Sequence, residues 1–434
     1  HGGVQRWLWQ KGWSALRPIQ EHAIPIILEA ERDLIITAAT AGGKTEAAFL
    51  PITSSLAAEP PGSVGCLCVS PLKALINDQT QRLEKLCGGA NVPVHRWHGD
   101  VPATQKHAVL KSPSGVLLIT PESLEANFVV RGPEIPTLFS ELRYVVVDEL
   151  HAFIGSERGK HLQSLLHRVE NAVGRMIPRI ALSATLGDMA LAADFLRPEK
   201  GREVEIIESN HDSREFQLQL RGYRYVEPET TLASGGEDED STEDDGVGDI
   251  QDIAAHLFRV LRGTDNLIFT NARVRVEQLA DLRRRFSELV RVPNEFLPHH
   301  GSLSKELRED AEDLLKSSHP GSIVCTTTLE LGIDVGNVTS VAQVDAPHST
   351  AGLRQRLGRS GRTEGAPAVL RLYISEEEIT PQTPLQDTLR SQLVQSIAVV
   401  QLLISRWYEP PTEGQLHLST LVHQVLSLIA ERGG

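Results

Sequence analysis

The chain has 434 residues and a net charge of −14; 40% of its residues are apolar and 23% are charged. This length fits two α/β domains plus an appendage, and the composition is that of a globular protein. No run of 18 or more apolar residues occurs, so we expect no membrane span and no membrane partner. The four cysteines are too few and too irregularly spaced for a disulfide framework or a zinc site, which favours a reduced, cytoplasmic location.

The acidic charge argues at first against a nucleic-acid partner, because proteins that bind nucleic acids usually carry a basic surface. However, seven carboxylates within residues 237–245 account for half of the net charge. The segment around them has almost no apolar residue and repels itself, which predicts a disordered linker at residues 226–249. The charge of the remaining chain therefore does not exclude a polynucleotide partner.

Short apolar runs alternate with helical patterns through both halves of the chain, which is typical of parallel strands joined by crossover helices. In the first half the expected strands are residues 34–36, 66–69, 116–119, 144–147 and 180–182. In the second half they are residues 266–269, 296–299, 323–325, 341–344 and 369–372. We predict two α/β domains, residues 1–225 and 250–376. The pattern then becomes helical, and we expect residues 377–434 to be the start of a third domain that the chain cuts short.

The first expected strand leads into a loop of small residues, Ala38-Ala39-Thr40-Ala41-Gly42-Gly43-Lys44-Thr45. In a phosphate-binding loop the backbone N–H groups contact the phosphates of ATP, the lysine reaches the terminal phosphates and the hydroxyl holds Mg²⁺. The alternative is a Gly-rich turn that happens to end in Lys-Thr. The candidate nucleotide contacts in this loop are Thr40, Ala41, Gly42, Gly43, Lys44 and Thr45.

Asp148 and Glu149 directly follow the expected strand 144–147. An Asp at a strand end can coordinate the Mg²⁺ of ATP together with Thr45, and the adjacent Glu can orient and deprotonate the attacking water. The alternative is a solvated strand terminus, which the preceding buried-type strand disfavours. We therefore take Lys44, Asp148 and Glu149 as catalytic candidates.

Residues 355–362 set three arginines three residues apart, which on a helix would place them along one face. Such a row is either a solvated surface or a clamp that neutralises charge on a transferring phosphoryl group. We take Arg359 and Arg362 as arginine-finger candidates and Gln355 as a further catalytic candidate. This choice predicts that the second domain completes the ATP site of the first.

The order of these motifs resembles that of the superfamily 2 helicases, whose fold is a pair of RecA-like domains. Leu16-Arg17-Pro18-Ile19-Gln20 resembles the motif that reads adenine, with Arg17 and Gln20 as nucleotide contacts. Ser183-Ala184-Thr185 resembles the motif that couples hydrolysis to strand binding. Residues 326–334 resemble the motif that touches both nucleotide and nucleic acid, with Gly332 and Asp334 as nucleotide contacts.

Within the superfamily, the runs PLKAL at 71–75, DELHAF at 148–153 and TLELGIDVG at 328–336 are most similar to the large helicase-related proteins, the Lhr family. That family implies a 3′ to 5′ translocase on single-stranded DNA, with a winged-helix domain after the RecA-like pair and a role in DNA repair or recombination. A helicase of the YprA and Hrq type is the alternative subfamily, because its members also carry a DELH box.

The resemblance also implies a strand track of main-chain N–H groups and small hydroxyls, which lets an acidic chain bind an acidic polymer. The candidate contacts are Pro71, Lys73, Thr120, Thr270, Arg273, His300, Gly301 and Thr327. Each of them also fits an ordinary loop or capping residue. We expect ATP and Mg²⁺ as cofactors and single-stranded DNA or a DNA/RNA hybrid as the partner. An RNA helicase, and an ATP-switched clamp that binds without unwinding, stay open as alternatives.

Overall fold

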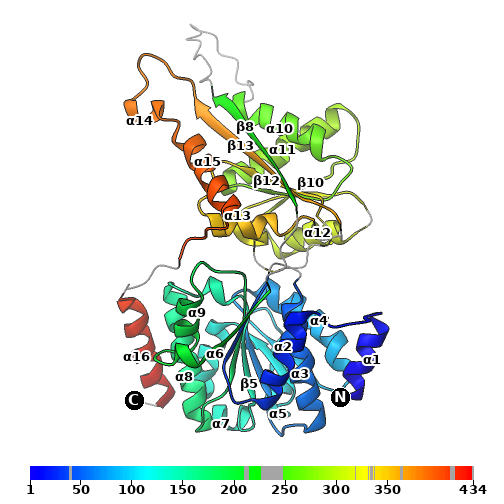
Figure 1. Cartoon of the computed structure of the whole chain (residues 1–434), viewed down its shortest axis with the longest axis vertical. Coiled ribbons are helices and arrows are strands. Elements are labelled where there is room, and N and C mark those ends of the chain that lie inside the picture. The colour runs from blue at the N-terminus through cyan, green and yellow to red at the C-terminus, as the bar shows by residue number, and fades with distance from the viewer. Residues whose placement is uncertain are drawn as a thin grey trace. The chain divides into compact units, whose positions relative to one another are not determined.

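The computed structural model describes residues 1–38, 42–209, 215–225, 248–317, 319–330, 332, 336, 338–361, 365–410 and 416–432. The chain divides into two compact units, His1–Asp212 with Pro410–Gly434, and Ser213–Glu409. Each unit contains one parallel sheet with flanking helices, as the strand and helix alternation predicts (Figure 1). The expected linker 226–249 lies almost wholly outside the described residues.

The first unit is built on a sheet with the strand order β3-β4-β2-β5-β6-β1-β7, and all of its described pairings are parallel. Its strands are β1 (Leu34–Thr37), β2 (Cys66–Val69), β3 (Val94–Trp97), β4 (Val116–Ile119), β5 (Tyr144–Val147), β6 (Arg179–Ser183) and β7 (Glu205–Glu208). Its helices are α1 (Gly2–Gln10), α2 (Pro18–Glu29), α3 (Lys44–Ala58), α4 (Lys73–Gly88), α5 (Ala103–Lys111), α6 (Pro121–Arg131), α7 (Ile135–Leu138), α8 (Glu157–Val173) and α9 (Met189–Leu196).

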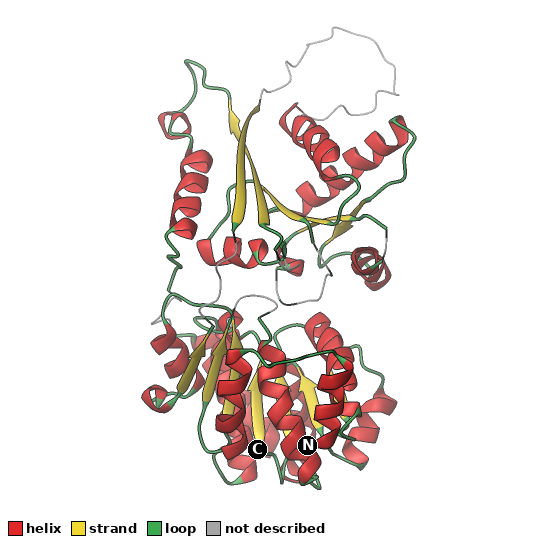
Figure 2. Cartoon of the chain, turned by 45° about the vertical axis from the view of Figure 1, so that its right-hand side comes forward, coloured by secondary structure: helices red, strands yellow, loops and turns green. Residues whose placement is uncertain are grey.

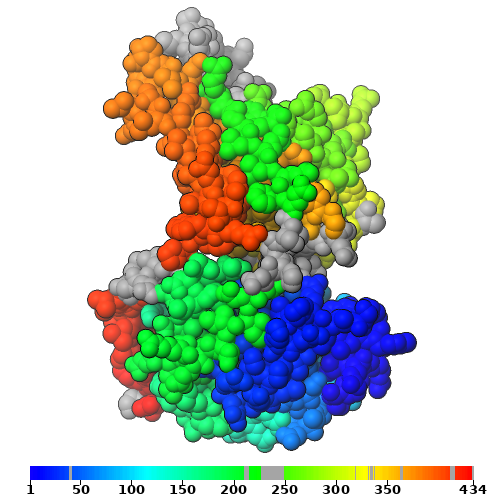
Figure 3. Space-filling view, in the orientation of Figure 1, coloured from blue at the N-terminus to red at the C-terminus, as the bar shows by residue number. Residues whose placement is uncertain are grey.

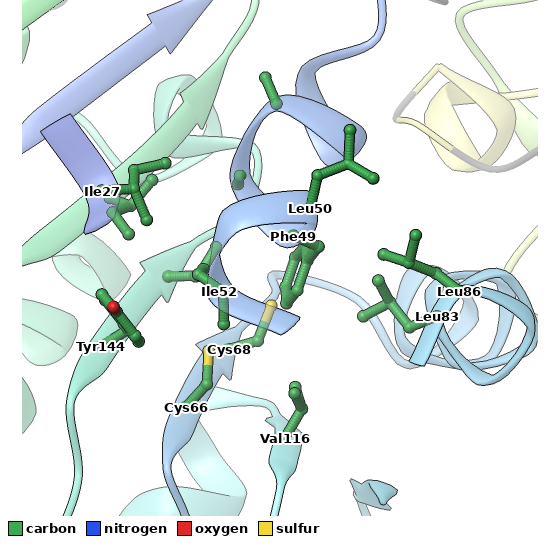
Figure 4. Close-up of a cluster of buried hydrophobic side chains, with 14 of the residues drawn as sticks. Ile27, Phe49, Leu50, Ile52, Cys66, Cys68, Leu83, Leu86, Val116 and Tyr144 are labelled. Atoms are coloured by element: carbon green, nitrogen blue, oxygen red, sulfur yellow. The ribbon is translucent and has the colours of Figure 1, made fainter. Parts of the chain in front are cut away.

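Successive residues of the central strands enter two different cores, because side chains of a strand alternate between the faces of the sheet. Ile36 and Cys68 join the core under α2, α3 and α4, while Ile35 and Leu67 join the core under α6 and α8. In the first of these cores Phe49 of α3 lies among residues of α2, β2 and α4 (Figure 4). Helix α3 is thus held over most of its length, and this holds Lys44 at its first turn in place.

The second unit has a sheet with the order β10-β11-β9-β12-β13-β8, again parallel throughout its described pairings. Helices cover this sheet (Figure 2). Its strands are β8 (Phe216–Tyr225), β9 (Asn266–Phe269), β10 (Phe296–His299), β11 (Ser322–Cys325), β12 (Ser340–Val344) and β13 (Ala368–Glu377). Its helices are α10 (Gly248–Leu261), α11 (Arg273–Leu289), α12 (Lys305–Lys316), α13 (Thr350–Leu357), α14 (Leu385–Thr388) and α15 (Ser391–Ile404).

The unit boundary differs from the one expected at residue 225. Strand β8 belongs to the second sheet, where all ten of its residues pair with β13, from Phe216 with Ala368 to Tyr225 with Glu377. The segment after residue 377 also differs from the expected separate domain. Helix α15 packs on α13 and β13 of the second unit, whereas α16 (Leu418–Arg432) packs on α6 and α8 of the first. Among the described residues, no helix has both the length and the apolar character needed to cross a membrane.

Candidate functional site

The carboxyl ends of β1, β2, β5 and β6 bring the candidate catalytic groups of the first unit together, because neighbouring parallel strands end at the same edge of the sheet. Val69 and Val147 are register partners, so Ser70 and Asp148, the next residue of each strand, lie side by side. The Ser70 hydroxyl donates a hydrogen bond to Asp148 Oδ2 at 3.3 Å. Sequence reasoning did not assign Ser70, although its place after β2, matching that of Asp148 after β5, is a signal that could have found it.

Lys44 and Thr45 form the first turn of α3, directly after the candidate phosphate-binding loop. Gly43 caps this helix with a left-handed backbone, φ +83°, which a side chain would oppose, and a Cβ there would lie 2.7 Å from Gln20 Nε2. Lys44 Nζ donates to the carbonyl of Ala38 at 2.8 Å, which ties the ammonium to the residue that follows β1. Gly42 is described and partly buried, whereas Ala39, Thr40 and Ala41 lie outside the described residues.

Gln20 joins the start of α2 to this loop. Its side-chain oxygen accepts from Arg17 N at 2.9 Å, and its Nε2 donates to Gly43 O at 3.4 Å. Gln20 is fully buried, so both polar ends of its side chain have partners within the protein. The candidate adenine-reading segment and the phosphate-binding loop are therefore mechanically connected.

Asp148 and Glu149 form a pair of carboxylates with different surroundings. Asp148 is 5% exposed, and Glu149 has a left-handed backbone, φ +50°. Burial and, after it, the charge of Glu149 raise the pKa of Asp148 to about 7, although Lys44 and the Ser70 hydroxyl act in the opposite direction. The site therefore concentrates negative charge in a buried position, where a cation would favour the ionised form.

His151 connects this carboxylate pair to the end of β6. Its Nδ1 accepts a hydrogen bond from Ala184 N at 3.2 Å and lies 3.5 Å from Glu149 Oε2. Burial lowers the pKa of His151, and an Nδ1 that accepts from a backbone N–H carries no proton, so the imidazole is neutral with its proton on Nε2. The Ser183-Ala184 segment is thus hydrogen-bonded to an imidazole that lies beside Glu149.

The first-unit candidates for nucleic-acid contact differ in their exposure to solvent and in the partners they already have. Lys73 Nζ, at the start of α4, forms a half-exposed ion pair with Asp100 at 2.9 Å. Thr120 is 5% exposed and caps α6, where its hydroxyl oxygen accepts from Ser123 N. Pro71 is buried. Thr120 is therefore a capping residue, which is the alternative to a nucleic-acid contact that its sequence position left open.

The second-unit candidates gather at one edge of their sheet. Phe269 and Cys325 are register partners, as are Cys325 and His299, so the residues that follow β9, β11 and β10 are neighbours. These residues include Thr270, Thr327, His300 and Gly301. Arg273 at the start of α11 donates to Ser302 Oγ at 2.8 Å, and His300 Nε2 lies 3.2 Å from a Glu277 carboxylate oxygen.

The arginine segment differs from the expected single helical face. Helix α13 ends at Leu357, so Arg359 lies beyond it, and Arg362 lies outside the described residues. Arg356 forms a buried ion pair with Glu330 at 2.8 Å, and Arg359, which is 2% exposed, donates to the Glu330 carbonyl at 2.7 Å. Glu330 thus fixes two of the three arginines.

The remaining candidates of the second unit are less constrained. Gln355 is a partly exposed residue of α13, and Gly332 is described and partly buried, whereas Asp334 lies outside the described residues. The α13 N-terminus has a partner that sequence reasoning missed: the Glu409 carboxylate accepts from Thr350 N at 2.7 Å and from Ala351 N at 3.0 Å.

Comparison with known proteins agrees with this arrangement. The DEAD/DEAH box helicase family matches residues 17–192, and the helicase conserved C-terminal domain matches residues 249–364. The ATP-dependent helicase Lhr-Core of Methanothermobacter thermautotrophicus is 32% identical over 83% of this chain and 42% of that protein. The Lhr helicase/probable uracil glycosylase of Mycolicibacterium smegmatis is 32% identical over 81% of this chain and 25% of that protein. The chain therefore spans less than half the length of these relatives.

Solved structures give the same picture. The structure of the Mycobacterium smegmatis helicase Lhr bound to ssDNA and AMP-PNP covers 99% of this chain and 53% of that one, with a TM-score of 0.81 and 28% identity. The DUF1998 helicase MrfA bound to DNA and AMPPNP, at 20% identity and a TM-score of 0.76, shares the fold. The chain therefore belongs to the DEAD/DEAH-box-like helicases of superfamily 2 and has the Lhr helicases among its relatives.

Proposed function

We propose that the chain is an ATP-dependent helicase core that uses ATP hydrolysis to move along single-stranded DNA. The observation that carries this proposal is the meeting of Lys44, Asp148 and Glu149 at the carboxyl edge of the first sheet. A cation that can reach phosphates, a buried carboxylate that can hold a metal and a second carboxylate beside it are the groups that phosphoryl transfer to water requires.

Each group has a distinct part in the proposed hydrolysis. Lys44 neutralises charge on the terminal phosphates, and Glu149 orients the water and accepts its proton. Asp148 and Thr45 offer carboxylate and hydroxyl oxygens, the hard ligands that suit Mg²⁺, and a bound cation would offset the raised pKa of Asp148. Arg359 and Arg362 are the candidates to neutralise the charge that develops on the transferring group.

Coupling to the strand is assigned to His151 and the Ser183-Ala184 segment. The hydrogen bond from Ala184 N to His151 Nδ1 supports this role, because a shift of the segment would move an imidazole that lies 3.5 Å from Glu149. The DNA track would use Thr270, His300, Gly301 and Thr327, which share one edge of the second sheet, with Arg273 beside them.

Single-stranded DNA is preferred as the partner because the Lhr structure with a TM-score of 0.81 holds ssDNA. Translocation from 3′ to 5′ and a role in DNA repair or recombination follow from the resemblance to the Lhr family. A DNA/RNA hybrid stays a candidate partner.

The proposal is tested by measuring ATP hydrolysis with single-stranded DNA, with single-stranded RNA and with neither, followed by unwinding of duplexes that carry a 3′ or a 5′ tail. We expect DNA to stimulate hydrolysis and the 3′-tailed duplex to be the one unwound. Stimulation by RNA alone would make the chain an RNA helicase. Strand binding that depends on ATP without unwinding of either duplex would make it a clamp, and both results would contradict the proposal.

A further inference from the structure

Three side chains outside the ATP site converge where α16 packs on the first unit. Glu125 comes from α6, His161 from α8 and His423 from α16, and their ligand atoms all lie within 4.8 Å of one another. His161 Nε2 is 2.7 Å and His423 Nε2 is 3.6 Å from the same carboxylate oxygen, Glu125 Oε2. Helices α8 and α16, which are far apart in the sequence, thus each place one imidazole nitrogen beside Glu125 Oε2. Helix α16 forms part of the surface of this unit (Figure 3).

The other oxygen of this carboxylate is already engaged. Gln424 Nε2 donates to Glu125 Oε1 at 2.6 Å, and Arg168 lies 3.7 Å from the same oxygen. These contacts fix the orientation of the carboxylate and turn Oε2 toward the two imidazoles. Outer contacts of this kind are what holds a metal-ligating carboxylate in place.

A simple ion pair does not account for the arrangement. His161 is 8% exposed, and its Nε2 makes no hydrogen bond of acceptable direction within the described residues, although it approaches Glu125 closely. Arg168 already supplies positive charge to the carboxylate, so two further protonated imidazoles would repel one another and the guanidinium.

Helix α16 buries few apolar side chains against the first unit, so a bound metal ion could stabilise its packing. The residues that α16 buries against α6 and α8 are the polar Gln424 and Ser427, which bond to Glu125 and Arg168. Leu428 is partly buried, but the other large apolar side chains are more than one-third exposed: Leu418, Leu421, Val422, Val425, Leu426 and Ile429. A helix that buries so little apolar surface gains little from the hydrophobic effect, so a metal bridge would add much of its docking energy.

We propose that Glu125, His161 and His423 bind one first-row divalent transition metal ion, with zinc as the best fit, and that the ion fastens α16 to α6 and α8. Two imidazole nitrogens and one carboxylate oxygen are a ligand set that zinc uses, and they leave one position of its tetrahedron for water. His423 is 61% exposed, which gives the ion a path of entry from solvent. The ATP site uses none of these three residues.

Zinc binding to the chelator-treated protein, measured by calorimetry and by metal analysis after dialysis, tests this site. The comparison is between the wild type, His423→Ala and the control His167→Ala, which removes an exposed histidine of α8 that is not part of the cluster. We expect one zinc ion per wild-type or His167→Ala chain, and an affinity at least about 10-fold lower in His423→Ala. Since His423 is exposed, the metal-free variant should keep the circular dichroism spectrum of the wild type.

Hydrogen exchange gives a second readout that other zinc-binding histidines would not affect. Zinc should slow exchange of residues 418–432 in the wild type and in His167→Ala, and leave it unchanged in His423→Ala. Equal zinc affinity in all three proteins, or zinc binding without any protection of α16, would overturn the proposal.

Discussion

Replacing Asp148 with Asn should stabilise the protein in the absence of nucleotide. Asp148 is 5% exposed, and burial together with the charge of Glu149 raises the pKa of its carboxyl from 3.8 to about 7. The folded protein therefore holds this proton more tightly than the unfolded chain does. By linkage, the contribution of Asp148 to stability falls as the pH rises through this interval.

The size of the effect follows from the two pKa values. The loss of unfolding free energy caused by ionised Asp148 begins near pH 3.8, grows by about 1.4 kcal/mol per pH unit, and is complete above about pH 7. Its full value is about 4 kcal/mol. Asn keeps the shape of the side chain without its charge. The variant should therefore exceed the wild type by about 2 kcal/mol at pH 5 and by about 4 kcal/mol at pH 8.

Urea denaturation followed by tryptophan fluorescence at pH 5 and pH 8 measures this difference, because four of the five tryptophans, Trp7, Trp9, Trp13 and Trp97, lie in the first unit. Asp100→Asn is the matched control. It removes a half-exposed carboxylate paired with Lys73, and should change stability by less than about 1 kcal/mol at either pH. The reasoning is refuted if Asp148→Asn is no more stable than the wild type at pH 8, or if its gain is equal at the two pH values.

Three further changes test other parts of the molecule. Arg283 is fully buried, burial lowers its pKa to about 9, and its guanidinium makes no hydrogen bond within the described residues. Arg283→Met should therefore leave the Tm unchanged or raise it, and a clear drop of the Tm in scanning fluorimetry would contradict this. Glu330→Gln breaks the buried ion pair with Arg356 and should lower the stability of the second unit by about 3 kcal/mol. Hydrogen exchange of β12 measures this loss, and unchanged protection of β12 would contradict the prediction. Deleting residues 237–245 should leave basal ATP hydrolysis unchanged and tighten DNA binding at low salt, and a cooperative loss of stability would show the segment to be structural.

Most of the strands that carry the fold could be predicted because they are short, largely apolar runs buried on both faces. All ten expected strands are present, and the ends of several bear the candidate site residues. The strands that were missed have a different character. These are β3, β7 and β8, in which most residues are partly buried or exposed, and their mixed sequences VHRW, EIIE and FQLQLRGYRY do not stand out from loops. The pairing of β8 with β13 joins residues far apart in the chain, which periodicity alone does not reveal.

The candidate site shows the same limit. The place of the candidate residues Lys44, Asp148 and Glu149 at one edge of the sheet could be predicted from spacing, because each comes after a predicted parallel strand. The contacts that hold them could not. The bond from Ala184 N to His151 and the ion pair between Glu330 and Arg356 depend on which strands are neighbours in each sheet. The end of α13 at Leu357 also separates the arginines that a helical repeat would have aligned.

The most direct test of the central claim measures ATP binding and ATP hydrolysis in the same preparations of wild type, Lys44→Ala and Glu149→Gln, with single-stranded DNA present. Lys44→Ala removes the charge that faces the phosphates, so both binding and hydrolysis should be lost. Glu149→Gln removes the proposed base and leaves Asp148 in place, so the variant should bind ATP and fail to turn it over. Substantial hydrolysis by either variant would show that the carboxyl edge of the first sheet is not where ATP is cleaved.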